Sequence, residues 1–326
     1  MSLATKYRPT IFDDVIGQET IIESLKASDI KQSYLFVGKT GCGKSSCARI
    51  LAKTINAHVI EIDTASTNSA ESMRNLIDSV KQPPITNDYI VVILDEVHCI
   101  SQQASQVLLL TLEQPPKHLI FILCTTEVDK IPKTIYNRCI VYEFTSIPVD
   151  KIKNRLEEIC KKENFKYEDN ALWVISHRAD GSMRQAISYL EQCSYKDITL
   201  DNVKSILIAD SFDTYLNLFY AVVDNNIKDI KTIINKVSNI DKFTEQFFCF
   251  ILDMNIYIKT NNMELTSIPY VYKTDFDDFS ILDKQFAEIL VEELLTLQYE
   301  GRNSPILKYL LIAVLMKVSN KEVVPF

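Results

Sequence analysis

The 326-residue chain has 47% hydrophobic and 24% charged residues, a composition typical of an ordinary globular protein with room for two or three domains. Its net charge of −8 argues against a generally basic nucleic-acid binder. Residues 241–300 carry four Lys and twelve Asp or Glu, so the rest of the chain is neutral and any polyanion site is expected toward the N-terminal part.

Residues 3–16 precede the first predicted strand. We expect an extended lead-in, because Pro9 disfavours a helix through Arg8, followed by a helix over about 18–27. The lead-in is either a solvated arm or one wall of a nucleotide-base site, and the residue types leave both interpretations open. The residues that would form the wall are Tyr7, Arg8, Pro9, Val15 and Ile16.

A phosphate-binding pattern follows the first strand. The apolar run Tyr34–Val37 predicts a buried strand, and Gly38-x-x-x-x-Gly43-Lys44-Ser45 then matches the phosphate-binding loop, with a helix to about residue 55. Glycines let backbone N–H groups surround phosphate oxygens, the lysine reaches the β- and γ-phosphates, and the serine hydroxyl holds Mg²⁺. Three of the six glycines lie here, which disfavours a simple turn. The expected ATP-binding residues are Gly38, Lys39, Thr40, Gly41, Cys42, Gly43, Lys44, Ser45 and Ser46.

The segment up to residue 144 alternates apolar strands with helices, which predicts a parallel α/β sheet. Further strands are predicted at 58–62, 89–94, 119–124 and 140–144. Helices are predicted at about 70–80 and 101–113, with a short one beginning at Pro132.

Polar residues follow two of these strands. Asp95 and Glu96 end the run 89–94, where two carboxylates need a cation or water. Beside a phosphate-binding loop, Asp95 is expected to support Mg²⁺, and Glu96 to orient and polarise the attacking water. Thr126 follows the run 119–124 and could hydrogen bond to that water, although a threonine there is more often a turn cap.

Beyond residue 146 the pattern is helical. Helices are predicted near 150–163, 169–177, 182–193 and 200–207, and again within 211–326, where 261–278 is the least regular stretch. Arg184 lies at the start of one helix, where its charge repels the helix dipole, so it is expected to have an anion partner.

Four strings carry a family resemblance. They are Lys6-Tyr7-Arg8-Pro9, Phe12-Asp-Asp-Val-Ile-Gly-Gln18, Leu94-Asp-Glu-Val-His98 and Gly181-Ser-Met-Arg-Gln-Ala186. In this order and spacing the chain resembles the sliding-clamp loader ATPases of the AAA+ class. The greatest similarity is to the bacterial DNA polymerase III gamma/tau subunits, and the chain is also similar to the small subunits of replication factor C.

The resemblance implies an α/β fold: an AAA+ P-loop domain with a five-stranded parallel sheet and helices on both faces (1–146), an all-α lid (147–209) and an all-α collar that assembles a ring (210–326). Arg184 looks like the sensor arginine that touches the γ-phosphate in its own subunit. Arg138 looks like the arginine finger offered in trans to a neighbour's ATP. The family's zinc module is missing and Asn137 replaces its usual Ser, as in a compact, for example viral, member.

The function implied by the resemblance is ATP hydrolysis with Mg²⁺ in a pentamer that opens a ring-shaped sliding clamp. Expected partners are other clamp loader subunits, the clamp, and primer–template DNA held through phosphates near Asn68 and Ser101. Contact with a DNA polymerase is expected only indirectly, because tau's polymerase-binding tail has no counterpart here. Two alternatives stay open: a scaffold that binds ATP but barely hydrolyses it, and another AAA+ remodeller such as a branch-migration motor.

The cysteines indicate the compartment. None of the eight forms a C-x-x-C pair, so no zinc module or disulfide framework is indicated, and several lie in apolar runs. With no secretory signal at Met1–Pro9 and no apolar run of membrane-spanning length, we expect a cytoplasmic protein at the replication fork, or in the host cytoplasm if viral, without membrane contact.

Overall fold

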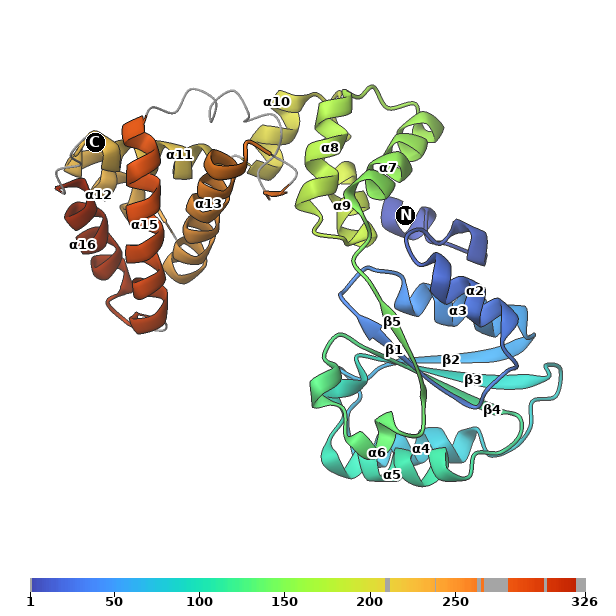
Figure 1. The fold of residues 1–326 in the computed structure, drawn as a ribbon. Helices are drawn as coiled ribbons and strands as arrows, with labels where there is room; N and C mark the ends of the chain where they lie inside the picture. The colour runs from blue at the N-terminus through green and yellow to red at the C-terminus, as the bar shows by residue number, and fades with distance from the viewer. Residues whose placement is uncertain are drawn as a thin grey trace. The chain divides into compact units, whose positions relative to one another are not determined.

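The computed structural model describes residues 2–208, 212–237, 239–262, 265–266, 281–301 and 304–320 (Figure 1). The chain forms two compact units, Met1–Ile198 and Thr199–Phe326. In the described ranges, no helix is long and apolar enough to cross a membrane. The predicted three-domain division, with boundaries after residues 146 and 209, stays a prediction.

A five-stranded parallel sheet lies at the centre of the first unit, in the order β2-β3-β4-β1-β5 (Figure 1). The apolar runs of β3 and β4 are continuous because both faces of these strands are covered by helices. The strand bounds are β1 Ser33–Gly38, β2 Ala57–Asp63, β3 Tyr89–Asp95, β4 Leu119–Thr125 and β5 Ile140–Phe144. The predicted strands are confirmed, and their carboxyl ends meet at one edge of the sheet.

Helices cover both faces of this sheet (Figure 1). One face packs against α2 (Glu19–Ala27) and α3 (Lys44–Thr54). The other packs against α4 (Ala70–Ser79), α5 (Gln102–Glu113) and α6 (Lys133–Tyr136). Successive side chains of a strand point to opposite faces, so Phe36 belongs to the first of these cores and Leu35 to the second.

The N-terminal segment differs from the predicted extended lead-in. It forms a short helix, α1 (Leu3–Lys6), and a 3₁₀ turn, η1 (Phe12–Asp14). Proline restricts only the residue before it, and α1 ends two residues before Arg8, so the proline rule was extended over too long a segment. Leu3, Phe12 and Val15 are buried, which excludes the solvated-arm interpretation.

Three helices complete the first unit: α7 (Val149–Glu163), α8 (Asp169–Arg178) and α9 (Met183–Cys193). Two of them contact the N-terminal segment: the Leu3 N–H donates to Glu191 Oε1 of α9 at 3.2 Å, and the Lys6 and Tyr7 side chains both reach Glu163 of α7. The helix predictions for this region are confirmed to within two residues.

The second unit is helical throughout its described residues. Its elements are α10 (Leu200–Val203), the π-helical η4 (Lys204–Ile208), α11 (Phe212–Val223), α12 (Ile227–Asn235), α13 (Ile240–Thr260), α15 (Ile281–Glu300) and α16 (Leu307–Ser319). A cluster of aromatic rings, Tyr215, Phe243, Phe247 and Phe250, lies between α11 and α13. Most of the stretch predicted to be least regular, 261–278, lies outside the described residues.

Gln18 joins three parts of the first unit. Its side chain is only 3% exposed, and Nε2 donates to the carbonyl oxygens of Thr145 at 2.8 Å and Cys42 at 3.3 Å. Its Oε1 accepts from the Thr145 N–H at 3.3 Å. The carboxamide thus links the start of α2, the phosphate-binding loop and the end of β5.

Replacing Gln18 with Ala should leave these backbone groups without their partner and lower the free energy of unfolding by about 2 kcal/mol. Urea unfolding monitored by the single tryptophan, Trp173 in α8, reports on this unit. The exposed Thr20→Ala change on α2 is the matched control and should cost less than about 0.5 kcal/mol. Equal effects of the two changes would contradict the assignment.

Candidate functional site

The loop between β1 and α3 is built around glycines. Gly38 has a φ of 151°, and a Cβ there would lie 2.4 Å from the Phe144 carbonyl oxygen. Gly41 has a φ of 79°, and a Cβ there would lie 2.1 Å from Ser182 Oγ. Both positions therefore need glycine for their conformation and for close packing.

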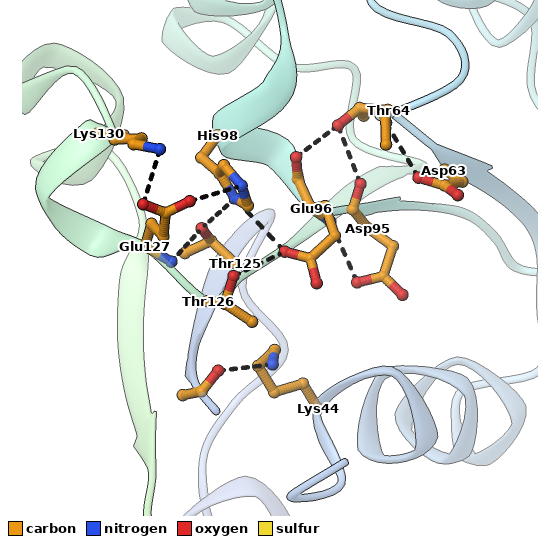
Figure 2. Close-up of polar contacts among 12 residues, drawn as sticks. Lys44, Asp63, Thr64, Asp95, Glu96, His98, Thr125, Thr126, Glu127 and Lys130 are labelled. Carbon is orange, nitrogen blue, oxygen red and sulfur yellow. Dashed lines mark hydrogen bonds and ion pairs between the residues drawn. The ribbon is translucent and has the colours of Figure 1, made fainter. Parts of the chain in front are cut away.

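Lys44 begins α3 and is 5% exposed. Its Nζ donates to the carbonyl oxygens of Gly38 at 2.7 Å and Lys39 at 3.0 Å, which holds the ammonium inside the loop. Figure 2 shows one of these two bonds. The ammonium can exchange these contacts for phosphate oxygens without leaving the loop. Lys39 and Thr40 themselves are exposed.

The next residue connects the loop to the sheet. Ser45 Oγ donates to Asp95 Oδ2 at 2.8 Å, while Asp95 Oδ1 accepts from the Glu96 N–H at 3.1 Å. A hydroxyl and a carboxylate oxygen thus lie side by side at the carboxyl end of β3. Both are hard oxygen ligands of the kind that Mg²⁺ prefers, and they leave most of its coordination sphere to water and phosphate, so the pair fits this ion.

Glu96 lies beside this pair with its backbone in the left-handed region, at a φ of 51°. Its carbonyl oxygen accepts from Thr64 Oγ1 at 2.7 Å, and its Oε2 accepts from Thr126 Oγ1 at 3.1 Å (Figure 2). Such strain in a non-glycine residue persists only where the surroundings hold it, and it is concentrated at functional sites. Glu96 and Thr126, both expected beside the attacking water, are joined here by a direct hydrogen bond.

A cavity of about 300 Å³ lies between the N-terminal segment, the loop, α7 and α9. Most of the residues predicted to bind the nucleotide line it: Tyr7, Arg8, Pro9, Val15, Ile16, Gly41, Cys42, Gly43, Lys44, Ser45, Ser46 and Arg184. Those outside the lining are Gly38, Lys39 and Thr40 in the loop, and Asp95, Glu96 and Thr126 at the strand ends. Ser45 lines the cavity and its hydroxyl donates to Asp95, so it connects the cavity with the strand ends.

The sequence predicted no site role for the other lining residues, which are Ser2, Ala4, Thr5, Asp14, Ile147, Arg155, Met183, Ile187 and Ser188. Helical spacing places Ile187 and Ser188 three and four residues after Arg184, on the same face of α9. That spacing is a signal which could have found these two. No motif marks Arg155, whose mostly buried guanidinium also pairs with Glu158 at 2.8 Å.

The start of α9 is docked on the loop. The Met183 N–H donates to the Gly41 carbonyl oxygen at 3.1 Å, and Lys39 Nζ pairs with Asp180 Oδ2 at 3.0 Å. These contacts bring Arg184 to the cavity, as its predicted anion partner requires.

Arg138 is held at the outer surface of the sheet layer. Its Nη2 pairs with Glu113 Oε1 at 2.6 Å, and its Nη1 donates to the Thr134 carbonyl oxygen at 2.8 Å. The side chain is 35% exposed and is not part of the cavity lining. It is therefore accessible to another molecule from the solvent side.

Burial raises the pKa of two residues that line the cavity. It raises the pKa of the Cys42 thiol above its usual value, so this residue is an uncharged wall rather than a nucleophile. Burial, reinforced by the hydrogen bond to Glu163, raises the pKa of Tyr7 to about 12. The Tyr7 hydroxyl therefore stays a donor at neutral pH, tying the N-terminal segment to α7.

Two family models match the chain. Residues 34–146 match the ATPase family associated with various cellular activities, and residues 151–193 match the ATPase lid domain of DNA polymerase III clamp loader subunits. These ranges contain the phosphate-binding loop, both carboxylates and Arg184.

Similarity to solved structures supports the fold. The Holliday junction branch migration motor RuvB of Thermotoga maritima superposes with a TM-score of 0.53, at 20% identity over 67% of this chain and 80% of that one. At this identity the likeness shows the fold alone.

Curated relatives extend the similarity beyond the lid. The tau subunit of DNA polymerase III from Salmonella typhimurium is 35% identical over 72% of this chain, which spans 42% of that relative's length. The gamma subunit from Buchnera aphidicola of Acyrthosiphon pisum is 32% identical over 85% of this chain and 84% of the relative. Since the match to the gamma subunit covers most of both proteins, the chain belongs to the family of bacterial DNA polymerase III gamma and tau subunits.

Proposed function

We propose that this chain is an ATP-hydrolysing subunit of a sliding-clamp loader, in which ATP binding drives ring assembly, clamp opening and DNA binding, and hydrolysis releases the closed clamp on DNA. The observation that carries the proposal is the Ser45–Asp95 hydrogen bond, which brings the phosphate-binding loop, a Mg²⁺-ligand pair and Glu96 to one edge of the sheet. Membership of the gamma and tau family supports the clamp-loading part.

The nucleotide is held from two sides. Tyr7, Arg8, Pro9, Val15 and Ile16 wall the base, supported by the packing of the N-terminal segment and its place in the cavity lining. The loop N–H groups and Lys44 hold the phosphates, and the N-terminus of α3 adds its positive end. Ser45 and Asp95 would hold a Mg²⁺ ion beside the phosphates, where it would offset their negative charge.

Glu96 performs the proton chemistry. Its carboxylate orients a water toward the γ-phosphate and accepts the proton that this water loses. Thr126 holds one carboxylate oxygen, Oε2, so the other remains for the water.

Two arginines stabilise the charge on the transferred phosphoryl group. Arg184 acts within its own subunit, which its position at the cavity supports. Arg138 acts in trans on a neighbour's ATP, which its accessible surface position supports. Because a missing finger costs a factor of about 10³–10⁵ in rate, hydrolysis then depends on assembly.

The proposed partners follow the family: other loader subunits, a ring-shaped clamp, and primer–template DNA held by its phosphates. The N-termini of α4 and α5 support the last, because they lie together where the Ser101 N–H donates to the Asn68 carbonyl oxygen at 3.1 Å. The three-part chain proposed here comprises an ATPase domain, a lid and a collar, and acts in the cytoplasm.

Changing Glu96 to Gln should lower ATP turnover by about 10²-fold or more and leave ATP affinity within about threefold, because only the proton acceptor is lost. Phosphate release and titration with a fluorescent ATP analogue measure the two quantities. The exposed Glu23→Gln on α2 is the matched control and should behave as wild type. A wild-type chain that already binds without turnover would favour the scaffold interpretation.

Mixing two inactive variants tests whether Arg138 acts as an arginine finger in trans. Arg138→Ala lacks the finger and Glu96→Gln lacks the proton acceptor, so each alone should be nearly inactive. An equimolar mixture should recover up to about a quarter of the wild-type rate, because random neighbours unite an intact Glu96 with an intact Arg138 at that frequency. Phosphate release from the mixture measures the recovery. If Arg138 acts within its own chain, mixing restores nothing.

A further inference from the structure

His98 lies behind Glu96, in the 3₁₀ turn η2 (Val97–Cys99) that follows β3. Its side chain is only 11% exposed, and neither the nucleotide cavity nor the steps proposed above use it. Figure 2 shows its ring between Glu96 on one side and Glu127 on the other, at the carboxyl ends of β3 and β4.

Both ring nitrogens are engaged. Nε2 lies 3.2 Å from Glu127 Oε1, within ion-pair distance of a carboxylate that can only accept a hydrogen bond. Glu127 in turn is held by Lys130, 2.7 Å away, which lowers the pKa of Glu127 and keeps it ionised. One edge of the ring is therefore anchored to a charged carboxylate.

The other edge faces Thr125 and Glu96. Nδ1 lies 3.0 Å from Thr125 Oγ1 and 3.4 Å from Glu96 Oε2. Thr125 is fully buried, and its Oγ1 also accepts from the Glu127 N–H at 3.0 Å, so the hydroxyl proton is available for Nδ1. Contacts at both edges leave the ring little freedom to rotate.

This fixed ring borders the Glu96 carboxylate. Oε2 of Glu96 lies between Thr126 Oγ1 at 3.1 Å and His98 Nδ1 at 3.4 Å. The second distance is longer than a good hydrogen bond, so the ring acts mainly as a wall of defined shape and polarity. With Oε2 confined there, the side chain has fewer rotamers in which Oε1 can point away from the substrate.

We propose that His98 is a positioning residue for Glu96: its ring, fixed by Glu127 and Thr125, confines Glu96 to the orientation that activates water. This inference rests on the proposed function, because it concerns the efficiency of a step that Glu96 performs. Glu96 acts on the water after ATP has bound, so the effect belongs to kcat and not to nucleotide affinity.

Three substitutions in the full chain separate the two edges of the ring. His98→Ala removes both, His98→Asn keeps an amide near the Nδ1 position, and His98→Gln keeps one near the Nε2 position. We expect kcat to fall about tenfold in the Ala and Gln variants and to stay within about threefold of wild type in the Asn variant. KM for ATP and binding of a fluorescent ATP analogue should change less than twofold in all three.

Two controls test whether His98 affects kcat through Glu96. The exposed His58→Ala change on β2 should leave kcat unaltered. In a Glu96→Gln background, His98→Ala should produce no further loss of the residual turnover, because a residue that acts through Glu96 has nothing left to position. Thermal unfolding of each variant monitors stability.

Any one of three results would overturn the inference alone. These are an unchanged kcat in His98→Ala, a further loss of turnover when His98→Ala is added to Glu96→Gln, and an equal loss of kcat in the Asn and Ala variants. The last result together with a lowered unfolding temperature would make His98 a purely structural bridge between β3 and β4. A wild-type chain that binds the analogue without turnover would instead overturn the proposed function, and this inference with it.

Discussion

The hydrogen bond from Ser45 to Asp95 is the contact on which the proposed chemistry depends. In the sheet, β4 lies between β1 and β3, so this bond spans a strand to join the start of α3 to the end of β3. Because the bond sets the distance between the loop and the carboxylates, it links the cavity to Glu96. A single hydroxyl thereby joins the cavity proposed to bind the nucleotide to the carboxylates proposed to act in hydrolysis.

The close approach of α9 to the loop is a second constraint. A Cβ at Gly41 would overlap Ser182, and the Gly41 carbonyl oxygen accepts from the Met183 N–H. Besides its proposed role at the phosphates, the glycine lets α9 dock on the loop and bring Arg184 to the cavity. Any movement of α9 would therefore act directly on the proposed nucleotide-binding loop.

Much of the sheet layer could be predicted from sequence, because strands buried on both faces must be continuous apolar runs, and the loop residues are demanded by phosphate chemistry. The helix at Leu3–Lys6 could not be predicted, because it is too short to show hydrophobic periodicity. The residues that contact this segment, Glu163 and Glu191, lie far along the chain. The same holds for the place of Arg155 in the cavity lining and for the contact between His98 and Glu96. Both depend on tertiary contacts between helices or strand ends that no local spacing encodes.

The most direct test of the central claim is a structure of the full chain with Mg²⁺ and a non-hydrolysable ATP analogue. The account predicts the triphosphate in the loop between Gly38 and Ser45, the base against Tyr7 and Val15, and the ion at the Ser45 hydroxyl beside Asp95. An analogue bound elsewhere, or one bound in the loop with the ion away from both Ser45 and Asp95, would contradict it.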